Sequence, residues 1–498
     1  MSQFVSWFKA IGLILAGITL VVLACLVVWS ADVARLRQAV GTHTTGELIR
    51  HAQRRLQGHT RLEAALARPL RWMQTQVERP VALGKVPSLG KGLQEWALPP
   101  VQYLPNGQPI AQLATRAATP PAGRLAVVSV RSADELVRAI QAAKAGQSIQ
   151  IAPGHYVFNR RVATGAAGTK AQPITVWATA PGQVTIELDT VEGFYVAHPF
   201  WVFENLHIRG ICKQHSNCEH AFHIVGAASS TVVRNNLIED FNAHIKVNGI
   251  GDAWPDDGLL QFNTLSNRTR RETSAPVAPV DIVAANRWQV TDNIISNFVK
   301  AQGNQVSFGL FMKGGGSGGR IERNLVVCTP NNMSQPGVRV GLSFGGGKTD
   351  KPFCRNQRCD FEHMVGMAVN NIVIHCNDFG IDVNQASTVL VAHNTLVNTA
   401  GIDVRSNSTA VRVYANLLEG RVRARDRSDM QLDMNEIVSM AAVFAGADVL
   451  QFEWLAPPAN IPSLPLVHKD FCGLARADGT LPGALADQAG CLQPGGAL

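Results

Sequence analysis

An asparagine that precedes two mostly apolar residues recurs along the chain at intervals of 31, 27, 30, 31, 47, 23 and 22 residues. The eight positions are Asn205, Asn236, Asn263, Asn293, Asn324, Asn371, Asn394 and Asn416. Periods of this length mark stacked structural units. Each unit also contains an earlier apolar run, such as HIKVNG or GIDVNQ, bounded by glycine or polar residues. Each unit therefore predicts one coil of short strands with glycine-rich corners.

Stacking such coils pairs every strand with its equivalents above and below, so that apolar residues face a shared core and the asparagines meet amide to amide. A leucine-rich repeat is the main rival, but its leucine spacing and its helix per repeat are absent. We therefore predict an all-β chain with a right-handed parallel β-helix over residues 125–426. The segment SADELVRAIQAAKAG, with Ser132 as N-cap, predicts a capping helix before the first strands. Residues 427–498, where the repeats fade, are expected to form a C-terminal cap.

The N-terminal third has a different character. IGLILAGITLVVLACLVVWS carries no charge, is long enough to cross a bilayer, and lies between Trp7 and Trp29. Residues 1–31 are therefore expected to be a transmembrane anchor, with a lipoprotein attached through Cys25 as the alternative. In residues 32–79 apolar residues recur at roughly helical spacing among many arginines, which predicts a helical basic stalk. Residues 80–124 are rich in Pro and Gly and are expected to form a linker.

Eight cysteines follow the apolar segment. Their even number, and the absence of C-x-x-C pairs or zinc-type spacing, favour disulfides over a metal site. We expect the pairs Cys212 with Cys218, Cys328 with Cys376, Cys354 with Cys359, and Cys472 with Cys491. Disulfides need an oxidising compartment, so the chain is expected to be a single-pass inner-membrane protein with its C-terminal domain in the periplasm.

The net charge of +8 is unevenly distributed. Residues 1–130 hold 14 Lys/Arg against 5 Asp/Glu, whereas residues 131–498 hold 31 against 32. The basic excess therefore belongs to the membrane-proximal part, where it contacts lipid head groups or only solvates the stalk. We expect a membrane and a polysaccharide as partners, and no nucleic acid.

Alternation along the first strand of each coil separates core from surface. If Ile381 and Val383 point inward, one outer face carries rows of polar side chains about 4.8 Å apart. These candidates for substrate binding are His223, Asn248, Asp382, Asn384, Asp403 and Arg405, with Lys246, Phe311 and Lys313 on the same face. A long groove of mixed charge suits a polysaccharide, although each residue singly fits a solvated face as well.

The loop WPDDGL places two carboxylates, Asp256 and Asp257, side by side. Such a pair can supply oxygen ligands to calcium, and it is also common in turns. Calcium is therefore a possible cofactor.

The opening of the repeat region resembles a known superfamily. SADELVRAIQAAKAGQSIQIAPGHYVF, AQPITVWATAPGQVTI and WVFENLHIRG look like the start of the chondroitinase-B-like and alginate-lyase-like enzymes with a right-handed parallel β-helix. KDFCGLARADGTLPGA is similar to the segment that closes many of these repeat proteins. The resemblance covers about residues 125–485 and implies a polysaccharide lyase fold.

In those lyases a lysine acts as base, an arginine assists, and calcium neutralises the uronate carboxylate. HIKVNG resembles the strand with the lysine, so the resemblance implies Lys246 as base. The following Arg-His-Gly strand has no counterpart, because the next coil reads PVDIVAAN, and the acidic calcium cluster is not recognisable. We therefore consider Lys313 or Arg320 as the residue that neutralises the carboxylate.

Three functions remain open from the sequence. The leading hypothesis is a membrane-anchored enzyme with lyase-like β-elimination on an acidic polysaccharide. The second is a protein that binds polysaccharide, or assembles the envelope, without chemistry. The third is a glycoside hydrolase that uses Asp382 and Asp403, expected on adjacent coils at a spacing close to the retaining geometry.

Overall fold

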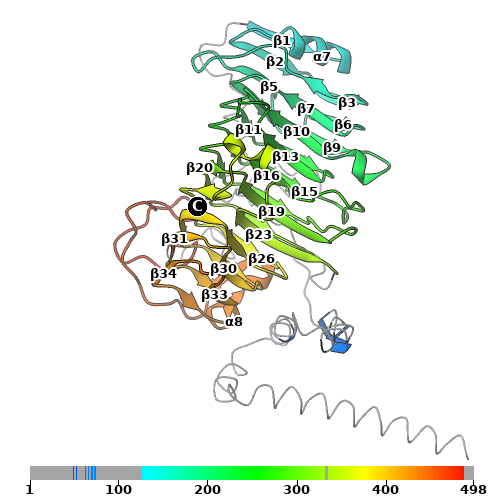
Figure 1. Ribbon diagram of the computed structural model, residues 1–498. Coiled ribbons are helices and arrows are strands. Elements are labelled where there is room, and N and C mark those ends of the chain that lie inside the picture. Colours follow the sequence, from blue (N-terminus) through cyan, green and yellow to red (C-terminus); the bar gives the residue numbers. More distant parts are fainter. Residues whose placement is uncertain are drawn as a thin grey trace, which may run out of the picture.

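The computed structural model describes residues 126–330 and 335–486, together with scattered helical positions between Ile49 and Gln74. Three sheets of 14, 10 and 11 strands run along the molecule, and every strand pair within them is parallel. Figure 1 shows the strands stacked from β1 at one end to β33 and β34 at the other. The fold is therefore the predicted parallel β-helix.

The 10-stranded sheet is central to the candidate site. It consists of β4 (Val162–Ala163), β7 (Glu192–Val196), β10 (His220–Val225), β13 (Ala243–Asn248), β16 (Val280–Val283), β19 (Val306–Lys313), β23 (Val338–Phe344), β27 (Ile381–Asn384), β30 (Gly401–Arg405) and β33 (Arg421–Ala424). The 14-stranded sheet consists of β1 (Ala126–Val130), β2 (Gln147–Ile151), β5 (Ile174–Ala178), β8 (Trp201–Glu204), β11 (Val232–Arg234), β14 (Leu259–Gln261), β17 (Gln289–Thr291), β20 (Gly316–Ser317), β21 (Arg320–Glu322), β24 (His363–Met364), β25 (Met367–Val369), β28 (Ala386–Ala392), β31 (Thr409–Tyr414) and β34 (Met430–Asp433). The 11-stranded sheet consists of β3 (Gly154–Phe158), β6 (Val184–Leu188), β9 (His207–Gly210), β12 (Leu237–Glu239), β15 (Thr264–Ser266), β18 (Ile294–Ser296), β22 (Leu325–Val327), β26 (Ile372–Ile374), β29 (Thr395–Val397), β32 (Leu417–Leu418) and β35 (Glu436–Ile437).

The asparagine ladder lies between the 14-stranded and 11-stranded sheets. Each Nδ2 donates to the Oδ1 of the asparagine in the next coil at 2.8–3.0 Å. The members are Asn236, Asn263, Asn293, Asn324, Asn371, Asn394, Asn416 and Asn435. Before each of them a residue other than glycine has φ between 50 and 58°. The left-handed backbone conformation at each of these corners costs roughly 1–2 kcal/mol of conformational free energy per residue. The hydrogen bonds of the asparagine that follows offset this cost.

Two details of the predicted ladder are wrong. Leu206 occupies the position equivalent to Asn236, because β9 pairs His207 with Leu237. Asn205 instead accepts a bond from Asn235. The ladder also continues to Asn435, so that one more coil, ending with β35, follows the expected boundary at residue 426.

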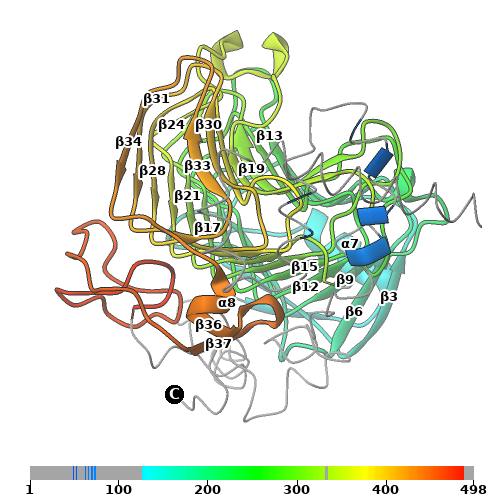
Figure 2. The same cartoon turned by 90° about the horizontal axis from the view of Figure 1, so that it is seen from below.

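The two ends of the stack differ. Helix α7 (Ala133–Gln141) begins at the predicted N-cap Ser132, whose hydroxyl accepts a bond from the backbone of Glu135, and lies at the first coil (Figure 1). The C-terminal elements α8 (Met440–Val443), β36 (Phe444–Gly446), η5 (Ala447–Val449) and β37 (Gln451–Trp454) belong to an apolar cluster on the outer face of the 11-stranded sheet. Figure 2 shows the orange and red segments beside the coils. In the last coil, Leu432 and Ile437 are equivalent to core residues yet remain 53% and 55% exposed.

The disulfides in the structure include Cys212–Cys218, Cys328–Cys376 and Cys354–Cys359, all three as predicted. Cys328–Cys376 joins two consecutive coils, because β22 pairs with β26. Cys472 is also disulfide-bonded, and Cys491, its expected partner, lies outside the described residues.

The expected anchor (1–31), including Cys25, and the linker (80–124) lie outside the described residues, as does most of the stalk (32–79). Within the part of the chain that the structure describes, no helix has both the length and the apolar character needed to cross a bilayer. The membrane anchor therefore stays a prediction.

Candidate functional site

The outer face of the 10-stranded sheet carries one continuous row of side chains in register. From β7 to β33 the row reads Tyr195, His223, Lys246, Asp281, Phe311, Ser343, Asp382, Asp403 and Arg423. The alternation predicted for this face is thus present, with Ile381 and Val383 fully buried in the core. The middle of the row, from Asp281 to Asp403, is almost completely buried. Half-exposed side chains therefore gather at two places, which we name the lysine patch and the arginine patch.

The lysine patch consists of Glu192, Glu219, His223, Lys246 and Asn248. Lys246 Nζ lies 2.6 Å from Asp281 Oδ2 on the next strand, and the lysine side chain is 21% exposed. Asp281 is 6% exposed, and its Oδ1 has no hydrogen-bond partner. The patch therefore holds a lysine that reaches the surface and is bonded to a buried carboxylate.

His223 lies on β10, directly beside Lys246 in the register. Its Nδ1 is 2.6 Å from Glu192 Oε1, and its Nε2 is 2.7 Å from Asn248 Oδ1. Burial favours a higher pKa for Glu192, but the hydrogen bonds and positive charges of His223 and Arg161 outweigh it and hold this pKa below its usual value. Glu192 is therefore ionised at neutral pH.

Two further titratable residues precede His223. Burial lowers the pKa of His220 to about 4, and the charges of His223 and Lys246 add to the shift. Burial, with a contribution from Glu192, raises the pKa of Glu219. At neutral pH His220 is thus a neutral imidazole, while Glu219 takes up a proton more readily than an ordinary glutamate.

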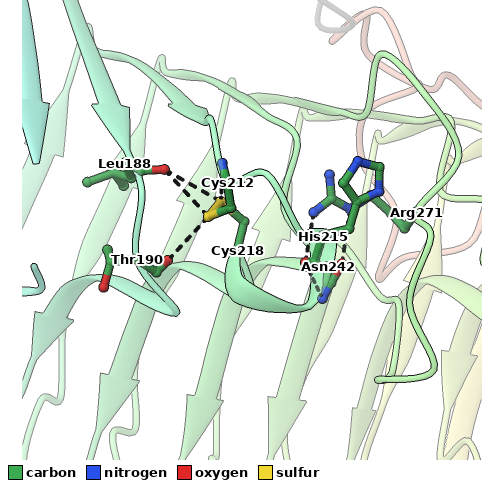
Figure 3. The surroundings of a disulfide bond; sticks show 7 residues. All are labelled: Leu188, Thr190, Cys212, His215, Cys218, Asn242 and Arg271. Carbon is green, nitrogen blue, oxygen red and sulfur yellow. Dashed lines mark hydrogen bonds between the residues drawn. A yellow bond between two sulfur atoms is a disulfide. The ribbon is translucent and has the colours of Figure 1, made fainter. Parts of the chain in front are cut away.

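The disulfide Cys212–Cys218 ends one residue before Glu219. Figure 3 shows the loop that it closes, together with Asn242 and Arg271. Asn242 Nδ2 and Arg271 Nη2 both donate to the carbonyl of His215, each at 3.1 Å. The loop leading into the lysine patch is therefore fixed at several points.

Lys313 and Arg320 occupy different sheets. Lys313 Nζ lies 4.8 Å from the centre of the Phe311 ring on β19 and forms no salt bridge with any described residue. Arg320 lies on β21 of the 14-stranded sheet, and its Nε bonds Glu322 at 2.6 Å. The structure thus places Arg320 in a different sheet from Lys246 and bonded to Glu322, and its role at a substrate carboxylate stays a prediction.

The arginine patch consists of Arg405, Arg423 and Arg425. Arg405 donates two bonds of 2.8 Å to Asp382, while Arg423 and Arg425 both pair with Asp403. Asp382 and Asp403 are adjacent in the register, as expected, but both are fully buried beneath these arginines. Asn384, on the same strand as Asp382, is also buried. The two carboxylates are therefore not free to act as the acid and nucleophile of a hydrolase.

Asp256 and Asp257 do not fit a calcium site. Arg355 donates to both oxygens of Asp256 at 2.8 and 2.9 Å, and Arg287 does the same to Asp257 at 2.5 and 2.7 Å. Arginine charges thus hold the oxygens that would face the cation. Over residues 126–330 and 335–486, no group of three potential ligands gathers for a metal. A calcium requirement would need other ligands and stays a prediction.

A family model matches one part of the chain. Residues 130–254 match the family model of Chondroitinase B, which is about a quarter of the chain and includes the lysine patch. A search of curated proteins finds no match.

Solved structures with a similar course of the chain have several activities. A PL6 family polysaccharide lyase from Pseudopedobacter saltans is 15% identical, with 62% of this chain and 92% of that chain covered and a TM-score of 0.32. A pectate lyase is 16% identical, with 70% and 83% covered and a TM-score of 0.45. A GH87 α-1,3-glucanase from Streptomyces thermodiastaticus is 16% identical, with 65% and 70% covered and a TM-score of 0.39. By its strand pairing the chain is a parallel β-helix protein, and its residues 130–254 resemble Chondroitinase B.

Proposed function

We propose that the protein is a polysaccharide-active enzyme that cleaves an acidic, uronate-containing polymer by lyase-like β-elimination, with Lys246 as the base. The observation that carries the proposal is the position of Lys246. It is half-exposed on the outer face, between His223 and Asp281 in the register, and within the segment that matches Chondroitinase B.

The reaction begins with removal of the sugar proton next to a carboxylate. A lysine can accept this proton only as the neutral amine. Asp281 is buried and bonded to Nζ at 2.6 Å, and so it fixes the position of the Lys246 amine on the outer face.

The carboxylate of the substrate also needs a cation, because the developing negative charge is delocalised onto it. Lys313 is suited to this task, since it has no acidic partner among the described residues. It lies two ladder steps from β13, about 10 Å along the stack. We therefore assign Lys313 to the substrate carboxylate.

The disulfides support an extracytoplasmic location. Together with the apolar segment at residues 11–30, this favours a membrane-anchored protein with its β-helix in the periplasm. A polysaccharide is then the expected partner.

The test incubates the purified protein with a panel of uronate polymers and follows the ultraviolet absorbance of unsaturated ends. Wild type and Lys170→Ala, a surface control in a loop, should form product, whereas Lys246→Ala should lose at least about 100-fold in rate. Equal rates in wild type and Lys246→Ala would refute the role of Lys246. Binding without product would favour the second hypothesis, a protein that binds polysaccharide without chemistry.

A further inference from the structure

We propose that His223 is the general acid of this reaction and gives the proton from its Nε2 to the oxygen of the leaving sugar. The inference rests on the proposed β-elimination and adds a catalytic residue to it. Elimination breaks a carbon–oxygen bond, and the departing oxygen must gain a proton unless it is already a good leaving group.

The position of His223 suits this task. It is the direct neighbour of Lys246 on the adjacent strand, so that the two side chains project from the same face about 4.8 Å apart at the backbone. Its side chain, on this outer face, is 15% exposed. A base and an acid on neighbouring strands can therefore reach one sugar residue from the same side.

Each ring nitrogen of His223 faces an oxygen atom: Nδ1 faces Glu192 Oε1 and Nε2 faces Asn248 Oδ1. An imidazole nitrogen that carries a hydrogen can donate to such an oxygen. The orientation of the Asn248 amide is set by its Nδ2, which donates to the carbonyl of Gly249 at 3.0 Å. Asn248 thus presents its Oδ1 to Nε2 of His223, so that a hydrogen-bond acceptor faces this nitrogen.

Glu192 completes the arrangement from β7. Its carboxylate bonds Nδ1 at 2.6 Å and is in turn bonded by Arg161 at 3.2 Å. A carboxylate on one ring nitrogen orients the imidazole and stabilises its positive charge. After His223 gives up the proton on Nε2, the hydrogen on Nδ1 remains bonded to Glu192.

The other charged and titratable groups near His223 are less suited. Lys246 and Asp281 form their own pair, and Tyr195 meets the edge of the His223 ring beneath Arg161. His220 is neutral, and its Nδ1 is buried without a partner. Glu219, 34% exposed, is the one remaining competitor in the described part of this patch.

The step balances as follows. The carbon–hydrogen bond next to the carboxylate breaks, and its proton goes to the Lys246 amine. The electron pair forms the carbon–carbon double bond, and the carbon–oxygen bond to the leaving sugar breaks. The leaving oxygen takes the Nε2 proton of His223, and the ammonium of Lys246 returns a proton to the imidazole through solvent.

The test compares a natural polymer with a synthetic uronide that carries fluoride in place of the leaving sugar. His223→Gln should slow the polymer reaction about 100-fold or more, yet change the fluoride reaction only a few-fold, because fluoride leaves without a proton. Lys246→Ala should be slow on both substrates. His155→Gln, on the 11-stranded sheet beside Glu187, is the control and should match wild type.

Other results would overturn the proposal. If His223→Gln slows both substrates equally, or neither, His223 is not the acid, and a selective loss in Glu219→Gln would transfer the role to Glu219. If wild type forms no unsaturated product from either substrate, the proposed function fails as well. A measurement on the resting wild-type protein adds a check without activity: Nε2 of His223 should show the nitrogen chemical shift of an N–H group. An unprotonated Nε2 would contradict the inference.

Discussion

Replacing Asn293 by alanine should open the stack locally, because this side chain lies in the middle of the ladder. Its Nδ2 donates to the carbonyls of Leu260 and Thr291 and to Asn324 Oδ1, at 2.8–3.0 Å. Its Oδ1 accepts from the backbone nitrogen and from Nδ2 of Asn263. The substitution removes this hydrogen-bond partner from the buried N–H of Asn263 and from the carbonyl of Leu260, and each unpaired group costs about 1–3 kcal/mol of free energy. The free energy of local opening should therefore fall by about 3 kcal/mol.

Native-state hydrogen exchange measures this loss at the affected coil. The backbone amide of Asn263 should exchange about 100-fold faster in Asn293→Ala than in wild type. The matched control is Asn435→Ala at the last coil, where the side chain is half-exposed and water can replace the lost bonds, so that the cost is about 1 kcal/mol. Equal effects of the two substitutions would refute the claim that buried ladder bonds stabilise the coils.

Three further predictions concern pH, the disulfides and calcium. Burial lowers the pKa of His363 from 6.5 to about 3, so that as the pH falls this histidine is protonated in the unfolded chain first. Between pH 7 and pH 5 the free energy of unfolding should therefore fall by about 2 kcal/mol more in wild type than in His363→Gln, as urea unfolding would measure, and equal falls would contradict this. Replacing both Cys212 and Cys218 by serine should lower the free energy of unfolding by about 2 kcal/mol and reduce the rate on polymer, whereas the same change at Cys354 and Cys359 should leave the rate unchanged. Equal rates in the two variants would refute a role for the loop that Cys212 and Cys218 close. Calcium should not raise the melting temperature through Asp256 or Asp257, because arginines bond both carboxylates. Asp256→Asn should therefore leave any response to calcium or a chelator unchanged, and a calcium-dependent rise that this substitution removes would contradict the prediction.

The repeat was sufficient to predict the fold, because both the core alternation and the asparagine spacing are local properties of the sequence. The position of Asn205 was misjudged because FENLHI contains an asparagine one residue before the true ladder position, which Leu206 fills. Asn435 was missed because it precedes Glu436 and not an apolar pair.

The site was predictable only in part. Alternation placed His223, Lys246 and Lys313 on the correct face, but it carried no information on which side chains other segments bury. Asp281 was missed, although it alternates with Val280 and Ile282 in VDIV, because its role depends on the register between coils of unequal length. Glu192 and Glu219 carried no motif and were identified only through their contacts.

The burial of Asp382 and Asp403 likewise depends on the next coil. Arg423 and Arg425 lie about 20 residues after Asp403, and only the stacked strands bring them to its carboxylate, as they bring Arg405 to Asp382. No single-strand pattern contains that information.

The most direct test of the central claim is the rate at which unsaturated ends form from uronate polymers with wild type and Lys246→Ala. The account predicts steady product formation by wild type and a loss of at least about 100-fold in Lys246→Ala, with the variant still folded. New reducing ends without unsaturation, or an undiminished rate in Lys246→Ala, would contradict it.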